Sequence, residues 1–250
     1  MSSKTFQFIF LPVICALQFG WAPLASASLV IPKNLTSNEI KKATEILGYS
    51  SACKILSNPF PLGGYSGIEI GYSTEVISTG ELASFGMKAP SQNETSYSLV
   101  TFGKGLYNNL DVFFQFSPLS QDENISNYGG QLRWGFYQAE YVPAHLSFLA
   151  SGNNVNFQNK ISTVSTAFDL VAGFSVQDVT LYTGIGLVRS IGSFAGGPDG
   201  VTDTGVRARA DLSQSHYVGG INVKFSNAFL ALELDRYTQA TYSGKLGARF

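Results

Sequence analysis

Few residues of this 250-residue chain have the types and spacing that catalysis requires. His145 and His216 are its two histidines, and therefore its candidates for acid–base chemistry near neutral pH. His216 closely follows Asp211, Ser213 and Ser215, so a base, a carboxylate and hydroxyl nucleophiles occur together. However, no D-x-H pair accompanies it, and neither serine lies in a nucleophile motif. We therefore expect His216 to be a polar structural residue, and we predict that the chain is not an enzyme.

Metal binding has equally little support. Asp199 and Asp203 lie in the sequence GGPDGVTDTG, but their spacing does not match a calcium loop, and Gly, Pro and Asp are also typical of turns. Cys53 stays single if Cys15 is removed with a leader, so no internal disulfide is expected. We predict no metal and no cofactor, and we interpret Cys53 as a small buried or half-buried residue.

The stretch that most constrains the fold is residues 240–250, in which apolar or small residues alternate with polar ones. A period of two indicates a strand with two unlike faces. One face carries Tyr242, Leu246, Ala248 and Phe250, and the other carries Lys245 and Arg249. In a soluble edge strand the basic face would meet water, whereas in a membrane barrel the apolar face would meet lipid.

Composition and the amino terminus decide between these alternatives. Charged residues make up 13% of the chain, where about 25% is usual, and the net charge of −1 gives no sign of a nucleic-acid partner. Residues 1–27 combine Lys4, an apolar run at 8–19 and the sequence Ala25-Ser26-Ala27, which is typical of a cleaved signal peptide. No later stretch holds 18 consecutive apolar residues, so a membrane form must be a closed barrel.

Residues 28–64 form a separate N-terminal part. Thr36 or Ser37 can cap a short helix with Glu39 in a capping interaction, and Gly48 is a natural end for that helix. Its apolar face is Ile40, Ala43, Ile46 and Leu47. A Pro- and Gly-rich linker follows. We expect a periplasmic or plugging segment, with sealing of the barrel as its simplest role.

Residues 65–250 show strand periodicity throughout and predict an all-β, closed, antiparallel up-and-down transmembrane barrel. The expected strands are at about 65–77, 96–106, 110–117, 128–140, 144–150, 168–176, 179–187, 216–225, 230–235 and 240–250. Long connections, among them residues 78–94, 151–163 and 191–214, alternate with short ones until the last link. The count is about ten strands, and eight is possible because the second strand is ambiguous.

The polar faces of these strands hold charges of both signs, which we expect to meet and pair in a narrow lumen. The predicted lumenal charges are Glu69, Asp111, Arg133, Asp169, Lys224, Glu233, Asp235, Lys245 and Arg249. Glu233 and Asp235 are the expected partners of Lys245 and Arg249. Aromatic girdles are expected from Tyr65, Tyr72, Tyr107, Tyr128, Trp134, Tyr217 and Tyr242.

With its signal, alternating strands and the terminal sequence GKLGARF, the chain resembles a small Gram-negative outer-membrane β-barrel protein over residues 65–250. The resemblance implies location in the cell outer membrane, contact with outer-membrane lipid, and insertion by the barrel-assembly machinery. It also implies that this machinery reads Tyr242, Leu246, Ala248 and Phe250 as an assembly signal, although Gly244 interrupts the apolar row.

Three classes of function fit such a barrel. The first is a structural or small-solute channel role, with a lumen narrowed by charged side chains. The second is a surface adhesion or binding module that uses extracellular loops, especially residues 191–214, for an unidentified ligand. The third is a barrel enzyme, whose activity would have to depend on His216.

Overall fold

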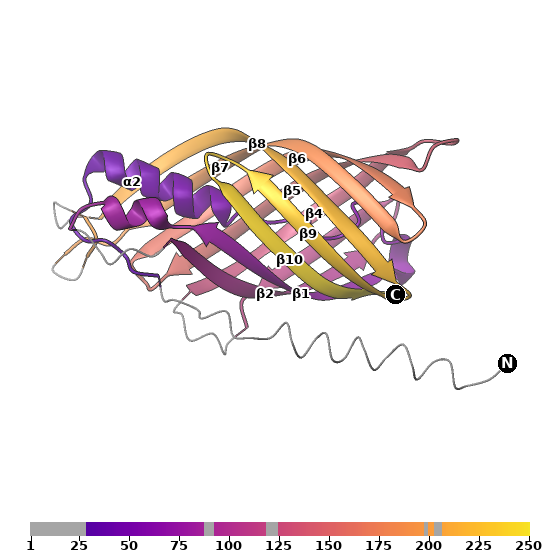
Figure 1. Ribbon diagram of the computed structural model, residues 1–250, viewed down its shortest axis with the longest axis horizontal. Coiled ribbons are helices and arrows are strands. Elements are labelled where there is room, and N and C mark those ends of the chain that lie inside the picture. Colours follow the sequence, from indigo (N-terminus) through magenta and orange to yellow (C-terminus); the bar gives the residue numbers. More distant parts are fainter. Residues whose placement is uncertain (1–28, 88–92, 119–124, 198–199, 203–206) are drawn as a thin grey trace.

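The computed structural model describes residues 29–87, 93–118, 125–197, 200–202 and 207–250 (Figure 1). Within them, ten strands follow one another, each antiparallel to the next, and the last pairs with the first to close a barrel. They are β1 (Ile68–Ser78), β2 (Glu94–Gly105), β3 (Leu110–Phe116), β4 (Ile125–Gln138), β5 (Ala144–Phe157), β6 (Ile161–Val176), β7 (Val179–Phe194), β8 (Ala208–Phe225), β9 (Ala228–Arg236) and β10 (Ala240–Arg249). The predicted fold class is confirmed, with ten strands rather than eight.

The two ends of the barrel differ in how the strands connect. At one end, here called the turn end, tight links such as residues 177–178 and 226–227 join the strands, and β1 begins beside the end of β10. At the other, the loop end, the links include the longer stretches 79–93 and 195–207. Strands, links and pairing therefore follow the up-and-down plan that the sequence predicted.

Two of the predicted loops are wrong in extent. β5 continues to Phe157, so residues 151–163 are mostly strand around a three-residue turn, and β7 and β8 take up much of residues 191–214. In these extensions the outward face turns polar while the inward face turns apolar. Val155 and Phe157, for example, are fully buried, whereas the neighbouring Asn154 and Asn156 are half-exposed. The alternation typical of a membrane barrel, with apolar residues outside and polar residues inside, therefore ends at these extensions. The strands themselves continue as a water-exposed sheet.

Apolar side chains cover the outside of the barrel between the two ends. On β6, Phe168, Leu170 and Phe174 are 56%, 45% and 44% exposed, whereas their inward neighbours Ala167 and Val171 are buried. A wide apolar exterior of this kind is stable only against lipid. The aromatic residues expected in the girdles all lie on this exterior or at its rims: Tyr65, Tyr72, Tyr107, Tyr128, Trp134, Tyr217 and Tyr242 are exposed.

A helical N-terminal segment, residues 29–67, precedes β1. It contains α2 (Ser37–Thr44), the π-helical turn η1 (Glu45–Tyr49) and the 3-10 turn η2 (Gly64–Ser66). Thr36 caps α2, and Glu39 completes a capping box, as predicted from the sequence. The helical course does not end at Gly48 but continues through Tyr49.

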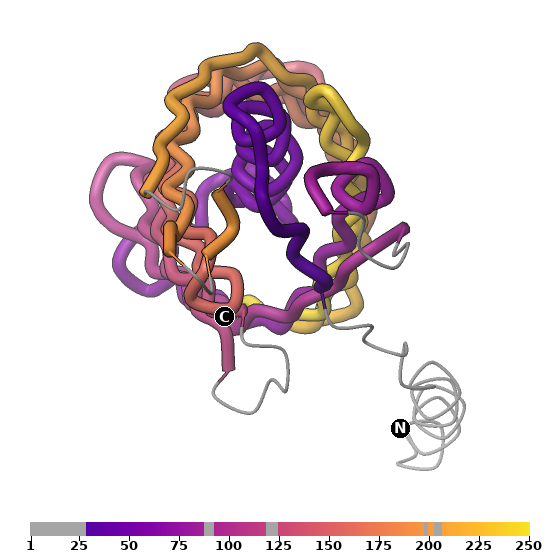
Figure 2. Tube along the Cα trace, turned by 90° about the vertical axis from the view of Figure 1, so that its left-hand side faces the viewer, coloured from indigo at the N-terminus to yellow at the C-terminus, as the bar shows by residue number. Residues whose placement is uncertain are grey.

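The N-terminal segment runs through the barrel from the loop end to the turn end. At the loop end, Lys33 bridges to Met87 and Leu35 to Thr202, both in links between strands. At the turn end, the carbonyl oxygen of Gly67 accepts a hydrogen bond from Gly105 N–H, with N···O 3.0 Å. Figure 2 shows the helical part inside the ring of strands.

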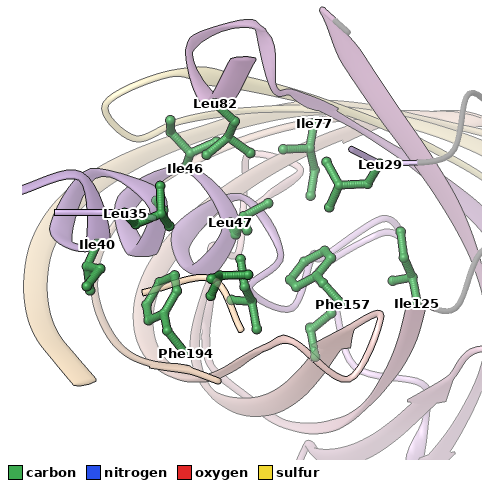
Figure 3. Close-up of a cluster of buried hydrophobic side chains, with 14 of the residues drawn as sticks. Leu29, Leu35, Ile40, Ile46, Leu47, Ile77, Leu82, Ile125, Phe157 and Phe194 are labelled. Atoms are coloured by element: carbon green, nitrogen blue, oxygen red, sulfur yellow. The ribbon is translucent and has the colours of Figure 1, made fainter. Parts of the chain in front are cut away.

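An apolar core fills the loop end of the barrel (Figure 3). One side of it comes from the helical segment, the other from inward residues of the strand extensions and from Leu82 of η3 (Gly80–Ser84). Its members include Leu35, Ile40, Ile46, Leu47, Ile77, Leu82, Ile125, Phe157 and Phe194. This core explains why α2 is amphipathic and why the extended strands reverse their pattern.

The wall of the barrel is uneven in height. β8 pairs with β7 along its length, but with β9 only from Tyr217 onward, because β9 ends at Arg236. α2 packs against the inner side of β7 and β8 where they extend beyond β9 (Figure 1).

Among the described residues, no helix combines the length and the apolar character needed to cross a membrane. The expected signal peptide, residues 1–27, and the loop residues Asp199 and Asp203 lie outside the described residues.

Candidate functional site: the filled lumen

Ten charged side chains gather in the lumen. Strand parity turns them inward, and the N-terminal segment adds Lys54 from within. The acidic members are Glu69, Glu75, Asp111, Asp169, Glu233 and Asp235, and the basic ones are Lys54, Arg133, Lys245 and Arg249. All but Arg249 are buried, so each ionised group depends on a partner nearby.

Glu69 collects the two basic residues of the last strand. Its carboxylate is 2.8 Å from Lys245 Nζ and 2.7 Å from Arg249 Nη2. The expected pairing of these cations with Glu233 and Asp235 is therefore wrong. The reason is closure: Arg249 lies directly opposite Glu69 across the β1–β10 seam.

Arg133 and Asp111 bind residues 57–62 of the N-terminal segment, in its part nearer the turn end. Arg133 Nη1 donates to Ser57 Oγ at 3.0 Å and to the carbonyl oxygen of Asn58 at 2.9 Å. Asp111 Oδ2 accepts from the backbone N–H of Leu62 at 3.0 Å. These two strand residues thus bind the segment rather than each other.

Glu233 binds the segment at mid-lumen. Its two oxygens accept the backbone N–H groups of Ile55 at 2.9 Å and Leu56 at 2.7 Å, and Tyr182 OH also donates to it at 2.7 Å. Leu56 has a φ of +42°, an uncommon conformation for a non-glycine residue. A carboxylate that accepts two successive N–H groups therefore stabilises a locally unfavourable bend.

His216 lies in the same region, shut inside the barrel. Its Nε2 is 2.7 Å from Asp169 Oδ1, and its Nδ1 is 3.9 Å from Asp235 Oδ1. Lys54 Nζ lies 3.6 Å from Asp235, and Tyr237 stacks on the imidazole with ring centroids 4.7 Å apart. A histidine between two carboxylates does occur here, although the sequence spacing gave no sign of it. It is 4% exposed, beneath the N-terminal segment.

Several interior residues escaped the sequence analysis. Lys54 lies in an irregular stretch with no periodicity to assign it a face. Glu75 was not among the predicted lumenal charges, and its partner Tyr97, whose OH donates to Glu75 Oε2 at 2.6 Å, lies on the second strand, which was ambiguous in sequence. Glu75 has the same parity as Glu69 on the first strand, and this could have indicated that it faces the lumen.

The remaining candidate residues lie apart from this network. His145 is buried near the turn end and meets Phe60 edge-on, and Lys224 is exposed at the turn-end mouth. Cys53 is half-buried within the N-terminal segment, with its sulfur 3.7 Å from the carbonyl oxygen of Gly152. Of the predicted assembly signal, Tyr242, Leu246 and Phe250 are exposed on the lipid-facing side and Ala248 is half-exposed there.

Little space is left beside the N-terminal segment. A cavity lined by Lys54, Glu75, Gln131 and Lys245 measures about 20 Å³, which is room for roughly one water molecule. At the turn end, a second cavity of about 120 Å³ lies beside Asn58, Asn222 and Arg249. The interior is thus filled by the chain itself and by its polar contacts at mid-lumen, and some space remains at the turn end.

Closed antiparallel strands, an apolar exterior and a polar interior define a membrane-spanning β-barrel. No protein-family model matches this chain, and no curated protein sequence matches it. Among solved structures it is similar to the N-terminal β-barrel domain of Pseudomonas aeruginosa OprF, with TM-score 0.38 and 12% identity over 75% of this chain and 98% of that one. It is also similar to the attachment invasion locus protein Ail of Yersinia pestis (TM-score 0.31, 14% identity, 74% and 97% covered) and to the Acinetobacter baumannii outer membrane protein Omp33 (TM-score 0.29, 8% identity, 76% and 97% covered).

Proposed function

We propose that the protein is an outer-membrane barrel kept closed by its own N-terminal segment, with a structural role in which it presents its loop end at the cell surface. The observation that carries this proposal is the passage of the segment through the whole lumen. Arg133, Glu233 and Asp111 bind its backbone at successive levels. A closed barrel acts through the surfaces at its two ends, and the loop end is backed by a packed apolar core. Because His216 is buried inside the barrel, the proposal gives it no catalytic role.

The loop end would offer a composite surface to an external ligand. The outer side of α2 exposes Ser37, Asn38, Lys41 and Lys42, while the opposite side of the helix packs into the apolar core. Under this proposal the adhesion role expected of residues 191–214 belongs to α2 and the neighbouring links together.

A small-solute channel is the second candidate, and one observation favours it. The wall behind the segment carries Glu69, Arg133 and Glu233, so the lumen would fill with water if the segment moved away. In that case the segment is a gate rather than a permanent seal.

Planar-bilayer conductance of the refolded protein tests closure. We expect no ion-conducting steps from the full chain, and steady steps from a variant that lacks residues 29–62. If the deletion prevents folding, Arg133→Ala with Glu233→Ala in the full chain should give brief openings instead. Steady conductance by the unmodified chain would favour the channel, and silence of every variant would contradict closure by the segment.

Surface presentation is tested by labelling in a Cys53→Ser background. A membrane-impermeant maleimide applied to intact cells should label Asn38→Cys in α2, at the loop end. It should not label Asn227→Cys, at the turn end, until the cells are opened. The reverse pattern would contradict the proposed orientation.

A further inference from the structure

The cavity of about 120 Å³ at the turn end, here called the turn-end cavity, is polar and opens toward the mouth of the barrel. Side chains of β6 to β10 line it, and Asn58 of the N-terminal segment completes the lining. Its volume is about six times that of the mid-lumen cavity. It therefore has room for a small solute rather than for a single water molecule.

Strand register explains why this space exists. Thr180 on β7 lies opposite Asn222 on β8, and both side chains are buried inside the wall. Two residues nearer the turn end, Lys224 lies opposite Phe229 of β9. The Phe229 ring takes up the room that Gly247 leaves on β10, where an added Cβ would come within 2.4 Å of the ring. The short side chains on β7 and β8 then leave space beside it.

Asn222 brings a buried polar group to the turn-end cavity. The residue is 5% exposed and lines the cavity, but its side-chain amide has no hydrogen-bond partner among the described residues. A buried amide is unfavourable unless a hydrogen bond compensates the loss of water. A polar solute in the cavity is the partner that this amide can reach.

The turn-end cavity also carries a surplus of positive charge. Lys224 has no ion-pair partner in the part of the chain that the structure describes. Glu69 balances two cations, Lys245 and Arg249. Asp178, in the link between β6 and β7, offsets one of the remaining charges, so a net positive charge is left. This surplus favours an anionic solute over a neutral or cationic one.

Arg249 is fixed in position and still has a nitrogen to offer. Its Nε and Nη2 donate to Glu69 at 3.1 Å and 2.7 Å, and Nη2 also donates to the carbonyl oxygen of Asn58 at 3.0 Å. Within the described ranges Nη1 makes no hydrogen bond, and the residue lines the cavity. The wall and the N-terminal segment thus hold the guanidinium group where it can donate to a solute.

We propose that the turn-end cavity binds a small oxyanion, a carboxylate or phosphate group, between Asn222, Lys224 and Arg249. The three side chains supply an amide, an ammonium and a guanidinium donor, and charged donors form short, strong hydrogen bonds to oxyanions. The hydroxyl groups of Ser175 and Thr180, 2.9 Å apart, add a further donor, because one of their two protons is not used between them. Neither the orientation of the barrel nor its closure to ions is needed for this binding.

Isothermal titration calorimetry of the refolded full chain in detergent micelles tests this inference, with inorganic phosphate, acetate and the neutral solute glycerol as probes. We expect saturable binding of an anion and no binding of glycerol. Asn222→Ala removes a donor without a change of charge and should weaken anion binding about tenfold, as expected for one hydrogen bond to a charged group. Lys224→Gln should weaken it to a similar extent, and it tests the site even if Asn222→Ala fails to fold.

The control Lys33→Gln removes the same charge from an exposed residue at the loop end and should bind like the unmodified chain. Equal weakening in Lys33→Gln and Lys224→Gln would overturn the proposal, because binding would then follow net charge alone. Absence of saturable anion binding, or binding of glycerol as tight as that of the anions, would also overturn it. A preference for phosphate or for acetate supports the site and identifies the oxyanion. None of these measurements depends on conductance, so failure here is distinct from failure of the closed-barrel proposal.

Discussion

Arg133 is the residue on which the filled lumen depends most. It is fully buried, donates to three residues of the N-terminal segment and lies 4.4 Å from the ring centre of Phe113. Burial of a cation is unfavourable unless hydrogen bonds and nearby carboxylates compensate it. The interior is therefore stable as a set of mutually dependent groups rather than as independent pairs.

Arg133→Met should destabilise the folded barrel by about 3–5 kcal/mol, since it leaves the buried carbonyl oxygens of Ile55 and Asn58 without their donor and removes a cation from the acidic lumen. The midpoint of urea unfolding in detergent micelles, followed by tryptophan fluorescence, measures this. Lys224→Met is the matched control, because Lys224 is an exposed cation at the turn end, and its effect should stay within about 0.5 kcal/mol. Similar midpoints for the two variants would contradict the role given to Arg133.

At this scale the sequence predicted which side chains turn inward better than it predicted their partners. A period of two was enough to assign Glu69 and Lys245 to one side of their strands. That the two residues meet depends on closure between β1 and β10, which are far apart in sequence. The lumenal position of Lys54 could not be predicted for a different reason. Residues in irregular backbone show no periodicity that would assign them to a face.

Among the elements, α2 shows how a local signal can predict a structure but not its place. The Thr36–Glu39 capping box and the apolar face of the helix were both predicted from residue types alone. Nothing local indicates that the apolar face packs inside a barrel, against residues as distant as Phe194. The strand extensions were missed for the same reason, since their pattern reverses only because α2 covers their inner side.

Glu39 links the start of α2 to the β1–β2 link, and this contact should depend on pH. Hydrogen bonds from Thr36 N–H, and then from Gly86 N–H at 2.9 Å, lower the pKa of Glu39 from its usual value of 4.5. A lowered folded-state pKa contributes stability above the usual value, and that stability is lost as the pH falls through the folded-state pKa.

Glu39→Gln should therefore weaken the loop end by roughly 0.5–1 kcal/mol at pH 7, and by progressively less as the pH falls below 4.5 and through the lowered folded-state pKa. Hydrogen exchange of the segment around Gly86, corrected for intrinsic rates, measures the difference. Glu81→Gln, an exposed change in η3, should leave exchange there unaltered at either pH. An effect of Glu39→Gln that grows as the pH falls would contradict this assignment.

On the scale of the whole molecule, the N-terminal segment and the closure of the barrel are directly linked. The segment passes through the lumen and joins β1, while β1 closes against β10, the last strand of the chain. The wall is closed only when β10 pairs with β1, and Arg249 of β10 also binds the segment through the carbonyl oxygen of Asn58. Closure of the wall and retention of the segment therefore share contacts at the β1–β10 seam.

Phe250 lies at this seam and has two separable roles. Its backbone exchanges hydrogen bonds with Ile68, at 2.8 Å and 2.9 Å, while its side chain is 64% exposed toward lipid. If the aromatic side chain is the assembly signal, Phe250→Ala should lower the amount of barrel in the outer membrane several-fold, about as much as deletion of Phe250. Heat-dependent gel mobility of membrane fractions measures the folded amount.

Tyr242→Ala, which removes an exposed aromatic residue from the same strand away from its end, should lower assembly less. If Phe250→Ala assembles normally while the deletion does not, the two backbone bonds at the seam matter rather than the side chain, and the predicted signal at Phe250 is wrong.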